Sequence, residues 1–117
     1  LPGSAPFHCA LLAPAADVMA AALADGPMHA PKVPVVANIT AAPVDEIGAI
    51  RRLLVEQVTG MVRWRESIEF LKEKGVTAAV ELGAGKVLTG LCKRIAPEIA
   101  ASSVGTPAEI EAFLKTL

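Results

Sequence analysis

The chain has 117 residues, of which 53% are hydrophobic and 20% are charged, and its formal net charge is -1. This composition is typical of a folded globular domain and argues against a disordered chain, which has more charge and fewer apolar residues. The numbers of basic and acidic residues are nearly equal, so the composition shows no excess of positive charge that would bind nucleic acid. No apolar run reaches the roughly 20 residues that cross a bilayer. We therefore expect one domain or less, with neither a nucleic-acid partner nor a membrane partner.

The amino-terminal part of the chain predicts a helix over residues 7–25. Apolar residues recur there with a period near 3.6, and Asp25 and Gly26 are expected to end the helix. Pro14 lies inside this span, where a proline is expected to kink the helix or to restart it.

His8 stands at the start of this helix, within the stretch SAPFHC at residues 4–9. Pro6 fixes its own φ and pushes the preceding residue toward extended geometry, so His8 can be held rigidly at the helix entrance. An imidazole in that position suits a general base, because it titrates near neutral pH. The alternative interpretation of His8 is an ordinary residue at the entrance of a helix.

Residues 33–39 form a β-branched and almost continuously apolar run. This pattern predicts a strand that is buried on both faces of a parallel sheet. Asn38 falls at the carboxyl end of that strand, the edge at which open α/β sheets form their sites. Asn38 is therefore a candidate site residue, and a turn cap is an equally good interpretation of it. His29, in the linker before the strand, is expected to be exposed.

Two helices are expected next, over residues 46–58 and 61–74. Asp45 is the expected N-cap of the first helix, and Gly60 is its expected left-handed cap. Gln57 falls near the carboxyl end of that first helix.

The last third of the chain predicts a strand, a glycine turn and a helix, over residues 76–82, 83–85 and 86–95. The turn does not match a phosphate-binding loop, because Val80 stands at the first glycine position and Val87 follows Lys86 where Ser or Thr is needed. We expect the glycines to allow close packing instead. A short edge strand over 101–105 and a final helix over 107–117 complete an α/β pattern with a largely parallel sheet.

The cysteines and histidines indicate neither a disulfide nor a metal site. Cys9 and Cys92 are interpreted as small buried residues of a reduced cytoplasmic protein, and the first residues lack the pattern of a signal peptide. Together with His8 and His29 they show none of the paired short spacings of zinc sites, so no metal is expected. A nucleophilic pair of Cys9 and His8 is disfavoured because neighbouring side chains usually diverge.

Five blocks of the sequence, in this order, resemble the C-terminal part of a malonyl-CoA:acyl carrier protein transacylase. They are SAPFHC at 4–9, VPVVANIT at 33–40, LVEQV at 54–58, VRWRESI at 62–68 and ELGAGKVL at 81–88. The resemblance covers nearly all of residues 1–117 but only part of that family's catalytic domain. It implies a portion of an α/β-hydrolase-like large subdomain, with a largely parallel sheet flanked by helices, that is incomplete without an N-terminal segment.

The resemblance also implies which residues do the chemistry. In this family a serine forms an acyl-enzyme, and His8 matches the histidine that acts as its general base. The main-chain carbonyl of Gln57 matches the group that orients this ring, the third role of a catalytic triad. Phe7 is a candidate substrate-binding residue that would exclude a methyl branch, or equally a core residue. Asn38 is a second candidate for substrate binding.

The N-terminal segment of the family supplies parts that this sequence lacks. The serine elbow, the oxyanion partner and the arginine that pairs with the malonyl carboxylate lie upstream in the family, and a ferredoxin-like subdomain is also missing here. The chain has no Gly-X-Ser-X-Gly, and neither Arg63 nor Arg65 matches the malonyl-binding arginine. Met61 and Ala84 stand where family members often carry proline, away from the implied chemistry. The start at Leu1 is interpreted as the beginning of a cut-out or processed piece.

Two functions from different classes remain open. In the first, the chain is the C-terminal portion of an acyltransferase that uses malonyl-CoA as substrate, needs no cofactor and acts only with its N-terminal part, on an acyl carrier protein. In the second, it is a non-catalytic binding module that retains a docking surface for the carrier protein. Lys86, Lys93 and Arg94 are candidate cations of that surface, although a solvated helix face is the better explanation of these three residues taken alone. In both cases we expect exposed apolar surface and a partner chain.

Overall fold

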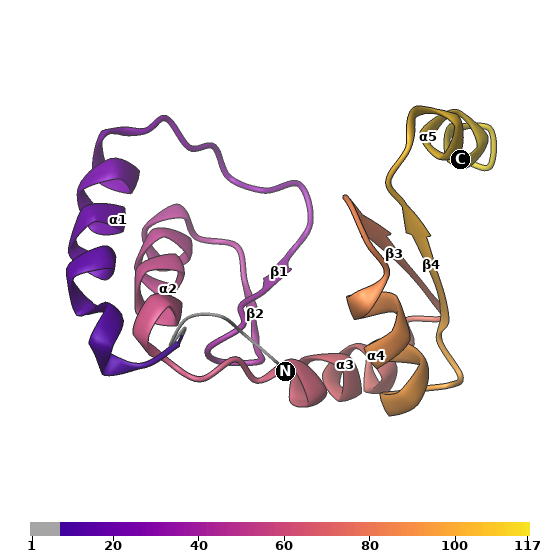
Figure 1. Cartoon of the computed structure of the whole chain (residues 1–117), viewed down its shortest axis with the longest axis horizontal. Helices are drawn as coiled ribbons and strands as arrows, with labels where there is room; N and C mark the ends of the chain where they lie inside the picture. Colours follow the sequence, from indigo (N-terminus) through magenta and orange to yellow (C-terminus); the bar gives the residue numbers. More distant parts are fainter. Residues whose placement is uncertain (1–7) are drawn as a thin grey trace. The chain divides into compact units, whose positions relative to one another are not determined.

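A computed structural model of the chain describes residues 8–117, and the expectation for Phe7 lies outside the described residues. The chain divides into two compact units, Leu1–Ser67 and Ile68–Leu117 (Figure 1). Each unit combines helices with a two-stranded sheet, so the expected α/β class is confirmed. Within residues 8–117, no helix has both the length and the hydropathy of a membrane span.

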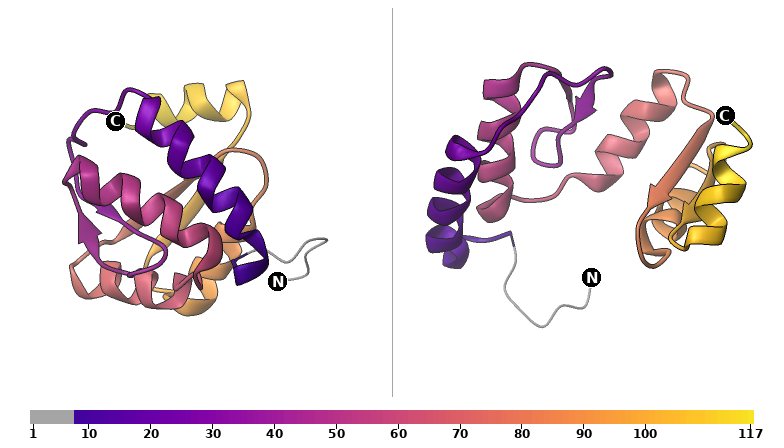
Figure 2. Two further views of the ribbon diagram at one scale, coloured as in Figure 1. Left: turned by 90° about the vertical axis from the view of Figure 1, so that its left-hand side faces the viewer. Right: turned by 90° about the horizontal axis from the view of Figure 1, so that it is seen from above.

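In the first unit, a short 3-10 helix, η1 (Ala10–Leu12), leads into α1 (Ala13–Asp25). The expected start of this helix was too early, and Pro14 does not kink it. Proline is tolerated at the first helical positions because the N–H groups there have no intrahelical partner, so Pro14 starts the helix. The helix packs along α2 (Ile47–Thr59), as both views in Figure 2 show.

The strand expected over residues 33–39 is wrong in its length, direction and burial. β1 covers only Val35–Val36 and pairs antiparallel with β2 (Pro43–Val44). The chain reverses between them in a tight turn, where the N–H of Ala41 donates to the carbonyl of Ala37 over 2.9 Å. Val35 is 40% exposed, so this strand is not enclosed on both faces. A parallel strand needs neighbours and helices on both sides, and the first unit supplies α2 and one short antiparallel partner.

Both predicted caps of α2 are corrected by the structure. Glu46, not Asp45, is the N-cap, and its carboxylate accepts the N–H groups of Gly48 and Ala49 over 2.8 and 2.7 Å. These two hydrogen bonds lower the pKa of Glu46, because they stabilise its charged form. At the other end, Gly60 is extended with a φ of -94° rather than left-handed. Glycine at position 60 leaves room for a neighbouring side chain, since a Cβ there would lie 2.5 Å from Cδ1 of Ile39.

The helix expected over residues 61–74 is present but shorter. It is α3 (Trp64–Glu73), which crosses the boundary between the two units. It starts late because the N–H of Arg63 donates to the carbonyl of Asn38 over 2.8 Å. The residues just before Trp64 therefore form a connecting segment and not a helical turn. The buried hydroxyl of Ser67 then donates back to the carbonyl of Arg63 over 2.8 Å in the first turn.

The second unit contains a parallel pair of strands, in agreement with the largely parallel sheet that the sequence predicts. β3 (Ala78–Leu82) and β4 (Ala100–Val104) run parallel, with Ala78 opposite Ala100 and Leu82 opposite Val104. They are connected by α4 (Val87–Ile95), which packs on both strands, and α5 (Pro107–Leu114) follows β4. The core of this unit consists of buried Ile68, Cys92, Ala96, Ile99 and Val104.

The turn between β3 and α4 has a structural explanation. Gly83 and Gly85 have φ values of +125° and +90°, which favour glycine. A Cβ on Gly105 would lie 2.4 Å from the carbonyl oxygen of Gly83, so the close packing is between the turn and the end of β4. No side chain caps the start of α4 locally. Glu81 on β3 caps it instead, accepting the N–H of Thr89 and its hydroxyl, each over 2.7 Å.

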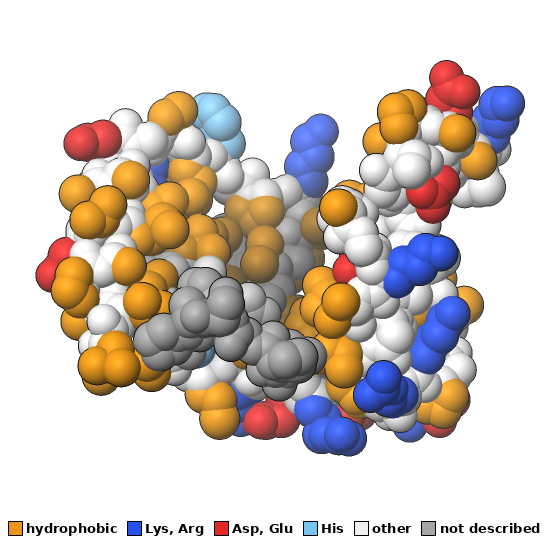
Figure 3. All heavy atoms as spheres, in the orientation of Figure 1, with side chains coloured by type: hydrophobic (Ala, Val, Ile, Leu, Met, Phe, Trp, Pro, Cys, Tyr) orange, Lys and Arg blue, Asp and Glu red, His pale blue; other side chains and the backbone are white. Residues whose placement is uncertain are grey.

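Large apolar side chains remain exposed in both units, as expected for a chain that packs against further structure. In the first unit, Leu11 and Val18 are 75% and 71% exposed, and Figure 3 shows hydrophobic atoms gathered over α1. In the second unit, Leu82 and Leu114 are 74% and 59% exposed. Burying such side chains is worth roughly 1.5–3 kcal/mol each, so a covering partner would stabilise the chain substantially.

Candidate functional site

The candidate site lies in the first unit, at the carboxyl end of α2. His8 stands just before η1, is exposed, and has a φ of +58°. Positive φ is uncommon outside glycine, although histidine adopts it several times more often than most residues. Such a conformation costs on the order of 1–3 kcal/mol and persists only where contacts maintain it. The positive φ of His8 therefore indicates that surrounding contacts determine the direction of its side chain.

The contact that holds the ring joins Nδ1 of His8 to the main-chain carbonyl oxygen of Gln57, over 2.7 Å. A carbonyl oxygen only accepts, so Nδ1 donates its proton in this hydrogen bond. In the neutral ring, Nε2 then carries the lone pair. The distance lies within the range expected for a base oriented by a main-chain acceptor. This geometry leaves Nε2 as the atom that can accept a proton.

The carbonyl of Gln57 is available because α2 ends two residues after it, at Thr59. The last four carbonyls of a helix have no intrahelical N–H partner. Gly60 donates its N–H to the carbonyl of Glu56 over 3.0 Å, and the chain then turns away in an extended conformation. The next carbonyl along the chain, that of Gln57, is therefore free to accept a side-chain donor.

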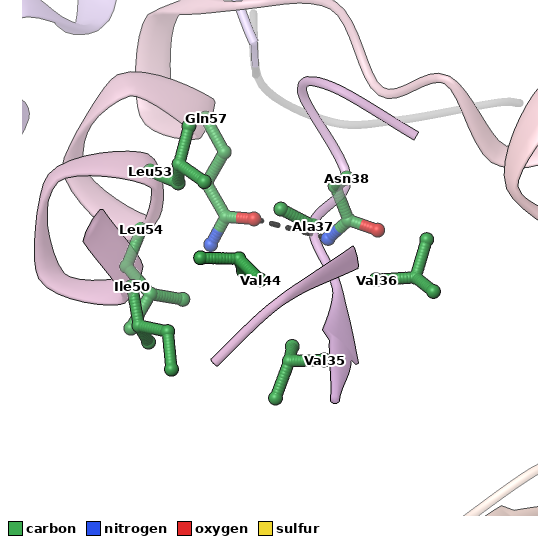
Figure 4. A pocket seen from close by; sticks show the side chains of 9 residues that line it. All are labelled: Val35, Val36, Ala37, Asn38, Val44, Ile50, Leu53, Leu54 and Gln57. Carbon is green, nitrogen blue, oxygen red and sulfur yellow. Dashed lines mark hydrogen bonds between the residues drawn. The ribbon is translucent and has the colours of Figure 1, made fainter. Parts of the chain in front are cut away.

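A second contact reaches the same glutamine through its side chain. Nδ2 of Asn38 donates to Oε1 of Gln57 over 3.0 Å, and this hydrogen bond is partly buried (Figure 4). Asn38 lies in the connection between β1 and β2, not at the edge of a parallel sheet. The Nδ2 of Asn38 therefore reaches across to α2. Neither interpretation of Asn38 from the sequence anticipated this contact.

A small pocket of ≈100 Å³ opens between β1, β2 and α2 beside the two amides (Figure 4). Aliphatic side chains form most of its wall, and the amides of Asn38 and Gln57 form its polar end. The lining residues are Val35, Val36, Ala37, Asn38, Val44, Ile50, Leu53, Leu54 and Gln57. Sites for small molecules usually measure about 300–1,000 Å³, so this pocket by itself is too small for a coenzyme-sized ligand.

The structure thus brings together three of the residues singled out in the sequence, namely His8, Asn38 and Gln57. The contribution of Arg63 was missed. Its main-chain N–H holds Asn38, and its Nη1 donates to the carbonyl of Thr40 over 3.2 Å. A hydrogen bond to Glu66, three residues along, raises the pKa of Arg63. The spacing of Arg63 and Glu66 is readable in the sequence, but the contact with the loop of Asn38 is not.

The other candidate residues lie elsewhere. His29 is exposed in the first unit, Cys9 is half-buried, and Cys92 is buried in the second unit. Lys86, Lys93 and Arg94 are exposed in the second unit, at or within α4. Across residues 8–117, no cluster of three or more His, Cys, Asp or Glu side chains has the arrangement of a metal site.

Comparison with known proteins shows which enzymes this chain is similar to. A scan against protein-family models finds no match. Among solved structures, the chain is similar to acyl carrier protein S-malonyltransferases. It matches the crystal structure of the enzyme from Bartonella henselae with a TM-score of 0.88 and 52% identity, over 99% of this chain and 37% of that one. It also matches a malonyl-transacylase solved in complex with its type II PKS acyl-carrier protein, with a TM-score of 0.85 and 41% identity, over 100% of this chain and 38% of that one.

A curated relative is similar to almost the whole length of this chain. The chain is 46% identical over 114 residues to the malonyl CoA-acyl carrier protein transacylase of Salmonella typhimurium, which covers 97% of this chain and 37% of the relative. The chain therefore resembles the C-terminal part of malonyl CoA-acyl carrier protein transacylase, and it spans about 37% of the length of that relative.

Proposed function

We propose that this chain is the histidine-bearing C-terminal portion of a malonyl-CoA:acyl carrier protein S-malonyltransferase. It would move a malonyl group from coenzyme A to the carrier protein thiol, acting together with an N-terminal part like that of its relatives. The observation that supports this most directly is the 2.7 Å hydrogen bond from Nδ1 of His8 to the Gln57 carbonyl. It leaves Nε2 able to accept a proton, in a chain similar to malonyl transacylases over nearly its whole length.

The proposed reaction has two half-reactions. Nε2 of His8 takes the proton of a serine hydroxyl as the serine oxygen attacks the thioester carbonyl. The carbon–sulfur bond breaks when the tetrahedral intermediate collapses, and the imidazolium gives its proton to the leaving thiolate of coenzyme A. His8 then takes the proton of the carrier protein thiol, whose sulfur attacks the acyl-enzyme. The serine oxygen leaves with the proton returned by His8. The chain has no Gly-X-Ser-X-Gly elbow, so in this proposal the N-terminal part supplies the serine.

Gln57 supports this chemistry through its main chain. Its carbonyl fixes the ring and its tautomer, the role of the third member of a triad. The carboxyl end of α2 also carries a partial negative charge, which favours the positive charge that forms on His8 during proton transfer. A neutral carbonyl orients the ring without placing a full negative charge beside a malonyl carboxylate.

The substrate and partner assignments follow from the same proposal. Malonyl-CoA is the donor, and ordinary acyl transfer requires no cofactor. A similar malonyl-transacylase has been solved in complex with its acyl-carrier protein, which supports a carrier protein as the acceptor here. Phe7 remains a candidate for excluding branched acyl groups, and we propose a cytoplasmic location.

The test is a chimera in which this chain replaces the matching C-terminal segment of the Salmonella typhimurium relative. Malonyl transfer from malonyl-CoA to the carrier protein is followed by the mass of the carrier protein. We expect transfer by the chimera, none by the 117-residue chain alone, and a loss of about 10²-fold or more in His8→Ala. His29→Ala is the matched control, because it removes an exposed imidazole from the same unit.

A folded chimera that transfers no malonyl, or one in which His8→Ala and His29→Ala behave alike, would contradict the proposal. The non-catalytic alternative is favoured if the inactive chimera still binds carrier protein. In that case, neutralising the exposed Lys86, Lys93 and Arg94 should abolish the binding.

A further inference from the structure

We infer that Asn38 is a positioning residue for His8, acting through the side chain of Gln57. Asn38 does not contact the imidazole in this arrangement. Its amide holds Oε1 of Gln57 over 3.0 Å, and the carbonyl of the same residue holds Nδ1 of His8 over 2.7 Å. The two hydrogen bonds of Gln57 therefore link the segment between β1 and β2 to the imidazole of His8. This inference rests on the proposed function of His8.

The carboxyl end of α2 needs such a support. Helix ends fray unless their carbonyls are capped, and Gln57 lies in the last turn of α2. Two common stabilising features are missing there, since the last turn has no basic residue and Gly60 does not adopt the left-handed cap conformation. The carbonyl that orients the ring therefore sits on a helix turn that lacks both of these features.

The loop that carries Asn38 is well placed to supply the support. Ile39 contacts the helix end so closely that a Cβ on Gly60 would lie 2.5 Å from its Cδ1. The main-chain carbonyl of Asn38 accepts the N–H of Arg63 over 2.8 Å, and the guanidinium of Arg63 holds the carbonyl of Thr40. The loop is thus fixed at Asn38 and at the two residues that follow it, and the amide of Asn38 is the group that holds the side chain of Gln57.

The hydrogen bond between Asn38 and Gln57 is suited to hold the glutamine in place. It is partly buried, and hydrogen bonds are stronger where water is excluded. Asn38 donates and Gln57 accepts, so an alanine at either position removes the link and leaves the main-chain carbonyl of residue 57 in place. Removing one such hydrogen bond is worth roughly 0.5–1.5 kcal/mol, which corresponds to a change of about 2- to 13-fold.

The kinetic test is a double-mutant cycle in the chimera, with Asn38→Ala, Gln57→Ala and the double substitution. We expect each single variant to lower kcat by roughly 3- to 10-fold with the KM for malonyl-CoA unchanged, and the double variant to lose no more than either single one. Thr40→Ala is the matched control, because it shortens an exposed side chain on the same loop and keeps the main-chain bonds. An unchanged kcat in Asn38→Ala, or a double variant whose loss is the product of the single losses, overturns the inference.

A spectroscopic test on the 117-residue chain is independent of activity. The nitrogen NMR signals of the His8 ring report which nitrogen carries the proton, and the hydrogen bond at Nδ1 sets this tautomer. We expect a smaller fraction of the Nδ1-protonated tautomer in Asn38→Ala and an unchanged fraction in Thr40→Ala. Equal tautomer populations in both variants would overturn the inference even if the chimera is active. If the chimera does not depend on His8, the proposed function fails, while this measurement still tests the connection from Asn38.

Discussion

The contact between Gly60 and Ile39 allows a quantitative prediction about the end of α2. In Gly60→Ala the new Cβ would lie 2.5 Å from Cδ1 of Ile39, 3.1 Å from its Cγ1 and 3.0 Å from the carbonyl oxygen of Glu56. Carbon atoms in favourable contact lie roughly 3.5–4.0 Å apart, so the end of the Ile39 side chain must move by about 1 Å. The substitution therefore overpacks the site that joins the loop of Asn38 to the helix.

Two opposing effects decide the change in the free energy of unfolding. Overpacking a well-filled site destabilises by about 1–3 kcal/mol. The backbone of Gly60, with φ -94° and ψ 164°, is accessible to alanine, so the reduced freedom of the unfolded chain returns about 0.4–1 kcal/mol. We expect Gly60→Ala to be less stable by about 1 kcal/mol. In urea this lowers the unfolding midpoint by on the order of 0.5 M, with an m-value near 2 kcal/mol/M.

A second substitution identifies the clash as the cause. Ile39→Val removes Cδ1 and should destabilise the parent chain by about 0.5–1.5 kcal/mol. In the Gly60→Ala background it should be neutral or stabilising, because it removes the closest contact of the new Cβ. Gly90→Ala is the control, since nothing lies within 4 Å of a Cβ there and it stands inside α4, where alanine is favoured. If Gly60→Ala raises the midpoint, or if the Gly60 and Ile39 effects simply add, the reasoning is refuted.

Two further predictions concern the acidic caps. Glu46→Ala should lower the urea midpoint and Asp45→Ala should leave it nearly unchanged, because only Glu46 accepts the N–H groups at the start of α2; equal effects would contradict the cap assignment. The hydroxyl and N–H of Thr89 lower the pKa of Glu81 below its ordinary value of 4.5. The charged carboxylate therefore stabilises the fold fully above pH 4.5, and this stabilisation is lost as the pH falls through the lower pKa of the folded state. Glu81→Gln should therefore be less stable than the parent at pH 7, and the difference in unfolding free energy should shrink as the pH is lowered below about 4.5; a difference that stays constant with pH would argue against the carboxylate as the cap of α4.

The candidate site could be predicted from the sequence only in part. The pairing of His8 with the Gln57 carbonyl came from the five ordered blocks, because no local pattern relates two residues that are 49 positions apart. Asn38 was noticed as a polar residue after an apolar run, but its partner was not. Hydrogen bonds between distant segments depend on how the chain turns, and the turn at Ala41, with its φ of +52°, is not encoded by a glycine.

The sequence by itself predicted the positions of the helices, and the strand, glycine turn, helix and short edge strand that the structure contains as β3, the turn, α4 and β4. Their signals are local, since apolar periodicity and glycine turns act within a few residues. Tertiary structure alone decided the rest. Glu46 and not Asp45 is the N-cap of α2. Both carboxylates could accept the N–H groups at the start of the helix, and the direction of the backbone decides which one does. Tertiary structure also made residues 33–39 a short antiparallel edge rather than a buried strand, because burial of a strand depends on which neighbours the rest of the fold provides.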